Sequence, residues 1–190
     1  MELLKQEIIK RGKVLPGHVL KVGSFLNQQM DVALLSKMAD SIFERFEDKG
    51  ITKILTVEAS GIALAVLVAE RFKVDAIFAK KSKTNNVDGQ VYSADCFSFT
   101  HKKQNVLIVP QEYLDKNDKV LVVDDFLANG EAVRALKQIV EQSKASLEGV
   151  AIAIEKGFQG GGDALRKDGV DLYSLAIIEN MTENDLTFRD

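Results

Sequence analysis

Hydrophobic positions along the chain follow first a helical and then a strand-like spacing. After Asp31, apolar residues recur every three or four positions up to Phe46, which predicts a long helix with one buried side. Asp31 is placed to cap the start of this helix, and Gly50 suits a left-handed end. The same kind of spacing predicts a shorter helix from Glu2 to Arg11.

From residue 52 onwards, short β-rich runs alternate with longer apolar or amphipathic stretches. The runs predict strands at residues 52–57, 74–79, 91–100, 105–110, 119–123, 149–154 and 171–178. The stretches between them predict helices at residues 62–72, at residues 131–144 and after Asp163. Residues 80–90 are polar and have no period, so a mobile loop is expected there. This alternation is typical of an α/β fold with a mostly parallel central sheet flanked by helices.

Composition and charge exclude several classes of protein. A chain of 190 residues with 46% hydrophobic and 28% charged positions is expected to form a single globular domain over residues 1–190. The net charge of −3 provides no basic surface for nucleic acid. Cys96, the single cysteine, excludes an internal disulfide and a cysteine-rich zinc site. The longest apolar run, Ile62–Ala69, has eight residues, which is too short to span a membrane. We therefore expect a cytoplasmic protein without a nucleic-acid or membrane partner.

The strongest chemical signal is a pair of acids, Asp124 and Asp125, placed directly after the apolar strand at residues 119–123. Two adjacent carboxylates at the end of a buried strand are costly unless they meet cations or hydroxyl donors. A loop of small residues, Ala128–Ala132, follows and opens a helix, where free N–H groups and the helix dipole favour a phosphate. The combination predicts a ribose 5-phosphate site. The alternative is that both acids only cap the helix.

Two further segments can contact an anion. The tight turn Glu58–Gly61 combines small residues with a hydroxyl and can present N–H groups, although a plain connecting turn is the alternative. Lys80, Lys81 and Lys83 open the polar loop and can reach a pyrophosphate, although a lysine run is also typical of a solvated loop. His18 and His101 lack the spacing of metal ligands, and we assign the run Gly160–Gly162 to loop flexibility.

The segment from Val120 to Gly130 resembles the phosphoribosyl-diphosphate signature of the type I phosphoribosyltransferases: four apolar residues, two acids, two apolar residues and a small-residue loop. Many members have Thr or Ser where this chain has Asn129, but the run Phe126–Gly130 is similar to the version in bacterial xanthine phosphoribosyltransferases. Segments around Val19–Gln29, Glu58–Ala63 and Ile154–Gln159 resemble that group in the same order, so the resemblance covers essentially the whole chain.

The resemblance implies a type I phosphoribosyltransferase fold in which about residues 1–30 contribute to a small hood over the base. It also implies a role for each of the following residues. The catalytic group comprises Asp124, Asp125 and Lys81. Phosphoribosyl diphosphate would contact Ala128, Asn129, Gly130, Glu131 and Ala132 with its 5′-phosphate, and Glu58, Ala59, Ser60 and Gly61 with its pyrophosphate. The base would contact Leu20, Asn27, Lys156 and Phe158.

The implied reaction transfers the phosphoribosyl group from phosphoribosyl diphosphate to a purine, xanthine above others, with release of pyrophosphate. Mg²⁺ is expected to bind mainly through the diphosphate and not in a protein metal site. A homodimer is also implied. The alternatives are a transferase for hypoxanthine and guanine or for adenine, and a regulator that senses phosphoribosyl diphosphate. The regulator would need a basic DNA-binding module, and the N-terminal segment is too short and too mixed in charge to supply one.

Overall fold

The structure is a computed structural model that describes residues 1–81, 89–98, 103–182 and 185–189. Lys83, His101 and most of the predicted loop at residues 80–90 therefore lie outside the described residues. The helices are α1 (Glu2–Arg11), α2 (Val32–Phe46), α3 (Ile62–Phe72), α4 (Glu131–Ser143) and α5 (Gly161–Lys167). The strands are β1 (Lys13–Leu15), β2 (Val19–Lys21), β3 (Lys53–Val57), β4 (Asp75–Ala79), β5 (Val91–Ser98), β6 (Lys103–Pro110), β7 (Lys119–Leu127), β8 (Ser146–Lys156), β9 (Leu172–Thr182) and β10 (Asp185–Phe188).

The central feature is a six-stranded sheet with the strand order β10-β9-β8-β7-β3-β4. Every neighbouring pair in it is parallel except β9 and β10, which are antiparallel. Two antiparallel hairpins, β1–β2 and β5–β6, stand apart from this sheet. The predicted α/β fold with a mostly parallel central sheet is confirmed.

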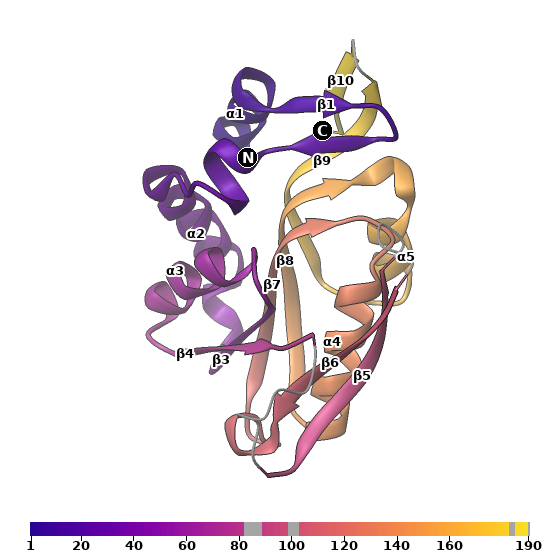
Figure 1. The fold of residues 1–190 in the computed structure, drawn as a ribbon. Helices are drawn as coiled ribbons and strands as arrows, with labels where there is room; N and C mark the ends of the chain where they lie inside the picture. Colours follow the sequence, from indigo (N-terminus) through magenta and orange to yellow (C-terminus); the bar gives the residue numbers. More distant parts are fainter. Residues whose placement is uncertain (82–88, 99–102, 183–184, 190) are drawn as a thin grey trace.

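Helices cover both faces of the sheet (Figure 1). One apolar core joins α1, α2 and α3 to the sheet, and a second joins α4 and the β5–β6 hairpin to the opposite face. Strand β7 lies between them: Leu121 and Val123 belong to the first core, whereas Val120 and Val122 belong to the second. All four side chains are fully buried, which is why this strand is a continuous apolar run without alternation.

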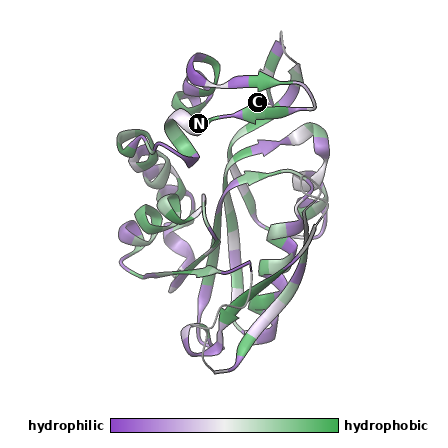
Figure 2. Ribbon diagram, in the orientation of Figure 1, coloured by the Kyte–Doolittle hydropathy of each residue, from purple (hydrophilic) through white to green (hydrophobic). Residues whose placement is uncertain are grey.

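The long helix α2 forms where its pattern predicts it. The Leu34 N–H donates to the Asp31 carboxylate at 3.2 Å, so Asp31 is the expected cap. A short 3₁₀ turn (Glu47–Lys49) follows the helix and ends at Gly50, whose φ of +66° is the left-handed conformation that favours glycine. Figure 2 shows hydrophobic and hydrophilic residues in alternating bands along the helices, as expected for elements buried on one side.

Three expectations about element bounds were wrong. Strand β7 continues to Leu127 and β8 to Lys156, since each extends by pairing with the other as far as Leu127 and Glu155. Asp124 and Asp125 therefore lie within the strand and not in the turn after it. The run Gly160–Gly162 is not a flexible loop, because Gly161 and Gly162 are buried and begin α5.

The N-terminal segment lies beside the carboxyl end of the sheet. It consists of α1, the β1–β2 hairpin and a π-helical turn, η1 (Gly23–Asn27), which begins two residues after β2. Leu4, Ile8 and Phe25 are fully buried in the same core as α2 and α3. In the turn of the hairpin, Nδ1 of His18 lies 3.2 Å from the Met181 carbonyl oxygen of β9. Gly17–Leu20 and Asn27 of this N-terminal segment line the same cavity as the ends of β3, β7 and β8.

Candidate active site

A cavity of about 1040 Å³ opens at the carboxyl ends of β3, β7 and β8. Parallel sheets of this kind bind ligands at this edge. Most of the predicted site residues line it: Leu20, Asn27, Glu58, Ser60, Lys81, Asp124, Asp125, Ala128, Asn129, Gly130, Glu131, Ala132 and Lys156. The structure thus brings together segments from the N-terminal hood, three strand ends and the start of α4.

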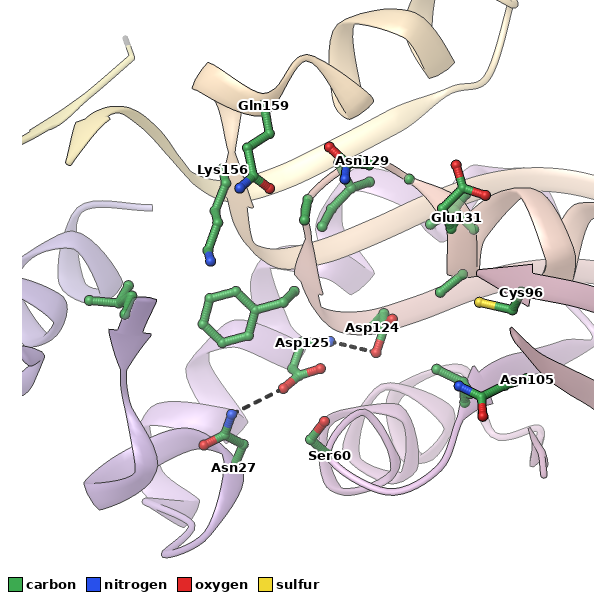
Figure 3. Close-up of a pocket in the computed structure, with 18 of the residues that line it drawn as sticks. Asn27, Ser60, Cys96, Asn105, Asp124, Asp125, Asn129, Glu131, Lys156 and Gln159 are labelled. Atoms are coloured by element: carbon green, nitrogen blue, oxygen red, sulfur yellow. Dashed lines mark hydrogen bonds between the residues drawn. The ribbon is translucent and has the colours of Figure 1, made fainter. Parts of the chain in front are cut away.

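Asp124 and Asp125 lie side by side on the floor of this cavity (Figure 3). Their exposed fractions are only 5% and 6%. The Asp125 N–H donates to Oδ1 of Asp124 at 2.9 Å, and Nδ2 of Asn27 donates to Oδ2 of Asp125 at 3.4 Å. Burial, and then the neighbouring charge of Asp125, raise the pKa of Asp124 well above its ordinary value. A pair held in this way would be stabilised by a cation or a hydroxyl donor in the cavity.

The 128–132 loop joins β7 to α4 directly beside the acids. Gly130 has a φ of +86°, and it precedes the first residue of α4. This left-handed conformation favours glycine, and a Cβ atom there would also lie 3.0 Å from Nη1 of Arg134. Within the part of the chain that the structure describes, no hydrogen bond uses the N–H of Asn129, Gly130, Glu131 or Ala132. These donors are available to an anion at the positive end of the helix dipole.

The turn after β3 lies against Asp124 and contacts the start of the lysine-rich loop. The Glu58 carboxylate accepts a hydrogen bond from the Lys81 N–H at 2.7 Å, and the peptide bond between Glu58 and Ala59 is cis. A Cβ atom on Gly61 would lie 2.3 Å from Oγ1 of Thr56 and 2.8 Å from Oδ1 of Asp124. Ala59 and Gly61 do not line the cavity. Gly61 instead allows this turn to pack against the carboxylate of Asp124.

Lys156, at the end of β8, points toward the part of the cavity covered by the hood (Figure 3). Its ammonium group donates to the His18 carbonyl at 3.0 Å and lies 6.0 Å from the centre of the Phe126 ring. Burial lowers the pKa of Lys156. An ammonium group has three protons, so Lys156 can contact His18 and a ligand at the same time.

Phe158, which we predicted to contact the base, is not brought to the cavity in this structure. Its ring packs against His18 with 5.3 Å between the ring centres and does not line the cavity. The aromatic side chain that does line it is Phe126. Phe126 was not predicted at the site, because the strand was expected to end at Val123 and instead continues to Leu127. The two apolar residues after the acids were the available signal that the strand continues. Gln159 also lines the cavity, and no sequence pattern pointed to it.

The chain matches a known protein family over most of its length. Residues 22–173 match the family described as "Phosphoribosyl transferase domain". This chain belongs to the phosphoribosyltransferase family. The predicted resemblance to type I phosphoribosyltransferases is therefore confirmed. Because the match includes β3 through β8, it covers the three strand ends that form the cavity.

Curated phosphoribosyltransferases extend this similarity to the full length. The chain is 51% identical over 190 residues to the xanthine phosphoribosyltransferase of Ruminiclostridium cellulolyticum, covering 100% of both chains. It is 49% identical over 182 residues to the xanthine phosphoribosyltransferase of Bifidobacterium adolescentis, covering 95% of this chain and 94% of that one. The xanthine phosphoribosyltransferase of Clostridium novyi is 46% identical over 190 residues, covering 100% of both chains.

Solved phosphoribosyltransferase structures share the fold. The APRTase of Giardia lamblia complexed with 9-deazaadenine superposes with a TM-score of 0.77 at 21% identity, over 93% of this chain and 98% of that one. The adenine phosphoribosyltransferase of Trypanosoma brucei superposes with a TM-score of 0.76 at 22% identity, over 92% of this chain and 78% of that one. At this identity the likeness concerns the fold alone.

Among the described residues, no helix has the length and apolarity that crossing a membrane requires.

Proposed function

We propose that this enzyme is a xanthine phosphoribosyltransferase of purine salvage. It would convert phosphoribosyl diphosphate and xanthine into xanthosine 5′-monophosphate and pyrophosphate. The observation that carries the proposal is that the acid pair, the 128–132 loop and Lys156 line one cavity, and that no described residue hydrogen-bonds to the N–H groups of Asn129–Ala132. The identity of 46–51% to curated xanthine phosphoribosyltransferases over the full length supports the choice of purine.

Phosphoribosyl diphosphate would span the floor of the cavity. Its 5′-phosphate would accept hydrogen bonds from the 128–132 loop at the start of α4, where the dipole favours negative charge. The carboxylates of Asp124 and Asp125 would accept hydrogen bonds from the ribose hydroxyls. The turn at Glu58–Gly61 and Lys81 would contact the pyrophosphate, since both reach the cavity from the side of β3.

Magnesium fits the donor set of this site. Two buried carboxylates that face the same cavity are the oxygen ligands that Mg²⁺ prefers, and the raised pKa of Asp124 indicates that a nearby cation would stabilise the pair. We propose that the ion is held mainly by the oxygens of phosphoribosyl diphosphate. When bound, it would supply positive charge to the departing pyrophosphate.

The reaction is a displacement at the anomeric carbon of ribose. The bond from this carbon to the pyrophosphate oxygen breaks, and a bond to a purine nitrogen forms. Positive charge develops on the ribose ring, and negative charge develops on the leaving group. The carboxylates of Asp124 and Asp125 would stabilise the positive charge on the ribose ring. The N–H groups of the Glu58–Gly61 turn and the side chain of Lys81 would stabilise the negative charge on the pyrophosphate. Positioning and electrostatic stabilisation therefore dominate the mechanism.

The base would occupy the side of the cavity under the hood. Leu20 provides an apolar wall, and Phe126 provides a flat ring on which a purine can stack. The Lys156 ammonium can donate to a carbonyl oxygen of the base, while the amide of Asn27 can donate or accept. Xanthine carries two such carbonyls. The 6-amino group of adenine would instead place a donor against the ammonium.

We expect xanthine to give the highest kcat/KM, followed by guanine and hypoxanthine, with adenine almost inactive. A site that hydrogen-bonds a substrate group can reject an analogue without it by up to ~10⁴. The measurement is nucleotide formation from phosphoribosyl diphosphate and Mg²⁺ with each purine separately. Higher efficiency with adenine than with xanthine would overturn both the choice of base and the role of Lys156.

The variant Lys156→Ala in the same assay separates the base contact from the rest of the site. The loss of a charged hydrogen bond is worth ~1.5–3 kcal/mol, so kcat/KM for oxopurines is expected to fall by roughly 10- to 150-fold. The KM for phosphoribosyl diphosphate should stay near its original value. Lys167→Ala, which removes an exposed lysine of α5, is the matched control and should leave both values unchanged.

We further propose that the enzyme acts in the cytoplasm as a homodimer. The resemblance supports the dimer, and edge strand β4 carries an exposed Phe78 near an exposed Tyr113, on a hollow of about 660 Å³. Sedimentation at assay concentration should give about twice the chain mass of 21.0 kDa. A fully active species that sediments at the mass of one chain would contradict the proposal.

A further inference from the structure

The glycines that begin α5 bring its main chain into contact with the 128–132 loop. A Cβ atom on Gly161 would lie 2.2 Å from the Ala128 carbonyl oxygen and 2.4 Å from the Asn129 carbonyl carbon. Both neighbours are main-chain atoms, so they cannot move away as the end of a flexible side chain would. In Figure 1, α5 lies beside the connection between β7 and α4. Any side chain at this position must therefore displace either α5 or the loop.

A buried ion pair fixes α5 to the sheet. Glu155 is fully buried in β8, and Arg166 of α5 donates to its two carboxylate oxygens at 2.9 and 2.7 Å. The Ser174 hydroxyl of β9 donates to the same carboxylate. A Cβ atom on Gly162 would lie only 2.0 Å from Oε1 of Glu155, so the second glycine leaves room for this pair. These hydrogen bonds hold α5 against β8 and β9.

Two more contacts reach the same loop. Leu165 of α5 lies 3.3 Å from the position that a Cβ atom on Gly130 would occupy. Nη1 of Arg134, in the first turn of α4, donates to the Asn129 carbonyl at 2.6 Å. Arg134 does not line the cavity, so its guanidinium acts on the loop and not on a ligand. The loop is thus contacted from outside the cavity, through the hydrogen bond to the Asn129 carbonyl and the packing of Gly161 on Ala128, while no described residue hydrogen-bonds to the N–H groups of Asn129–Ala132.

We propose that Gly161 and Arg134 are positioning residues for phosphoribosyl diphosphate, which set the conformation of the 128–132 loop so that its N–H groups face the 5′-phosphate. The inference rests on the proposed function and extends it to residues outside the cavity. The close approach at Gly161 fixes how near the loop lies to α5. The hydrogen bond from Arg134 fixes the direction of the Asn129 peptide group, and with it the direction of the next N–H.

The test compares Gly161→Ala with Gly169→Ala. Gly169 follows the other end of α5, and a Cβ atom there would have no neighbour within 4 Å. We expect Gly161→Ala to raise the KM and the calorimetric Kd for phosphoribosyl diphosphate at least tenfold. The KM for xanthine and the kcat at saturation should change by less than threefold. A role in folding alone would lower the active fraction, and with it kcat, without raising the KM for phosphoribosyl diphosphate.

Arg134→Met tests the inference if Gly161→Ala does not fold. Arg134 is partly exposed on α4, so its replacement should leave the fold intact. Lys137→Met, one turn further along the same helix and paired with Glu141, is its control. We expect about a fivefold to tenfold rise in KM for phosphoribosyl diphosphate with Arg134→Met and no change with Lys137→Met. If the folded variants and the original chain bind phosphoribosyl diphosphate equally well, the inference about Gly161 and Arg134 is wrong but the proposed function stands. Failure of the original chain to bind phosphoribosyl diphosphate overturns the proposed function as well.

Discussion

Replacing Asp125 or Asp124 by asparagine is expected to lower kcat by roughly a hundredfold or more. Each change removes a negative charge next to the ring on which positive charge develops, and preorganised groups of this kind contribute ~10²–10³ to the rate. The fold should persist, because asparagine has nearly the same shape and its carbonyl oxygen can still accept the hydrogen bond from the Asp125 N–H. Initial rates with saturating xanthine and phosphoribosyl diphosphate give the measurement.

Glu141→Gln is the matched control for both variants, because it neutralises an exposed acid on α4 outside the cavity. Its turnover should equal that of the original chain. If Asp124→Asn and Asp125→Asn also keep the original rate, the acids have no part in turnover. The proposed mechanism would then be wrong.

Asp124→Asn should at the same time increase the free energy of unfolding at neutral pH, because it removes a charge that burial and the neighbouring Asp125 destabilise in the folded state. The pKa of Asp124 is raised in the folded state above its ordinary value of 3.8, so the folded protein binds this proton more tightly than the unfolded chain does. This contribution to stability is present in acid and is lost as the pH rises from about 3.8 through the folded pKa. Urea unfolding across this range without substrate is the measurement. A less stable Asp124→Asn at pH 7 would contradict it.

Gly130→Val is expected to weaken the binding of phosphoribosyl diphosphate at least a hundredfold, equivalent to ~2.7 kcal/mol. A β-branched residue is strongly disfavoured at a φ of +86°, and its Cβ would contact both Arg134 and Leu165. The loop must change shape to accommodate these atoms, and its N–H groups then no longer converge on the 5′-phosphate. Titration calorimetry of the folded variant with phosphoribosyl diphosphate and Mg²⁺ gives the affinity directly.

Gly169→Val separates backbone strain from damage to the site. Gly169 has a comparable φ of +82°, is exposed, and has open space around its Cβ position. This control should lose stability to a similar extent while it keeps its affinity for phosphoribosyl diphosphate. Equal affinities of Gly130→Val and the original chain would remove the 128–132 loop from the binding site.

The features that the sequence predicted correctly depend on neighbours along the chain. Helix α2 follows from the apolar spacing between Asp31 and Phe46, and the central position of β7 follows from its unbroken apolar run. The acid pair and the 128–132 loop were recognisable because their residues are adjacent in the sequence and match a known motif in type and spacing. The structure places these segments at one cavity, as expected. Their roles toward a ligand remain predictions.

Only the tertiary structure decided what depends on contacts between distant residues. Strands β7 and β8 run past their predicted ends because each satisfies the main-chain hydrogen bonds of the other. That extension brings Phe126 to the cavity, whereas Phe158 packs on His18 of the hood. The glycines at the start of α5 looked like a flexible loop, since a sequence shows the absence of a side chain but not what occupies its place. At Gly161 that space is filled by the backbone of the 128–132 loop, and at Gly162 by the carboxylate of Glu155.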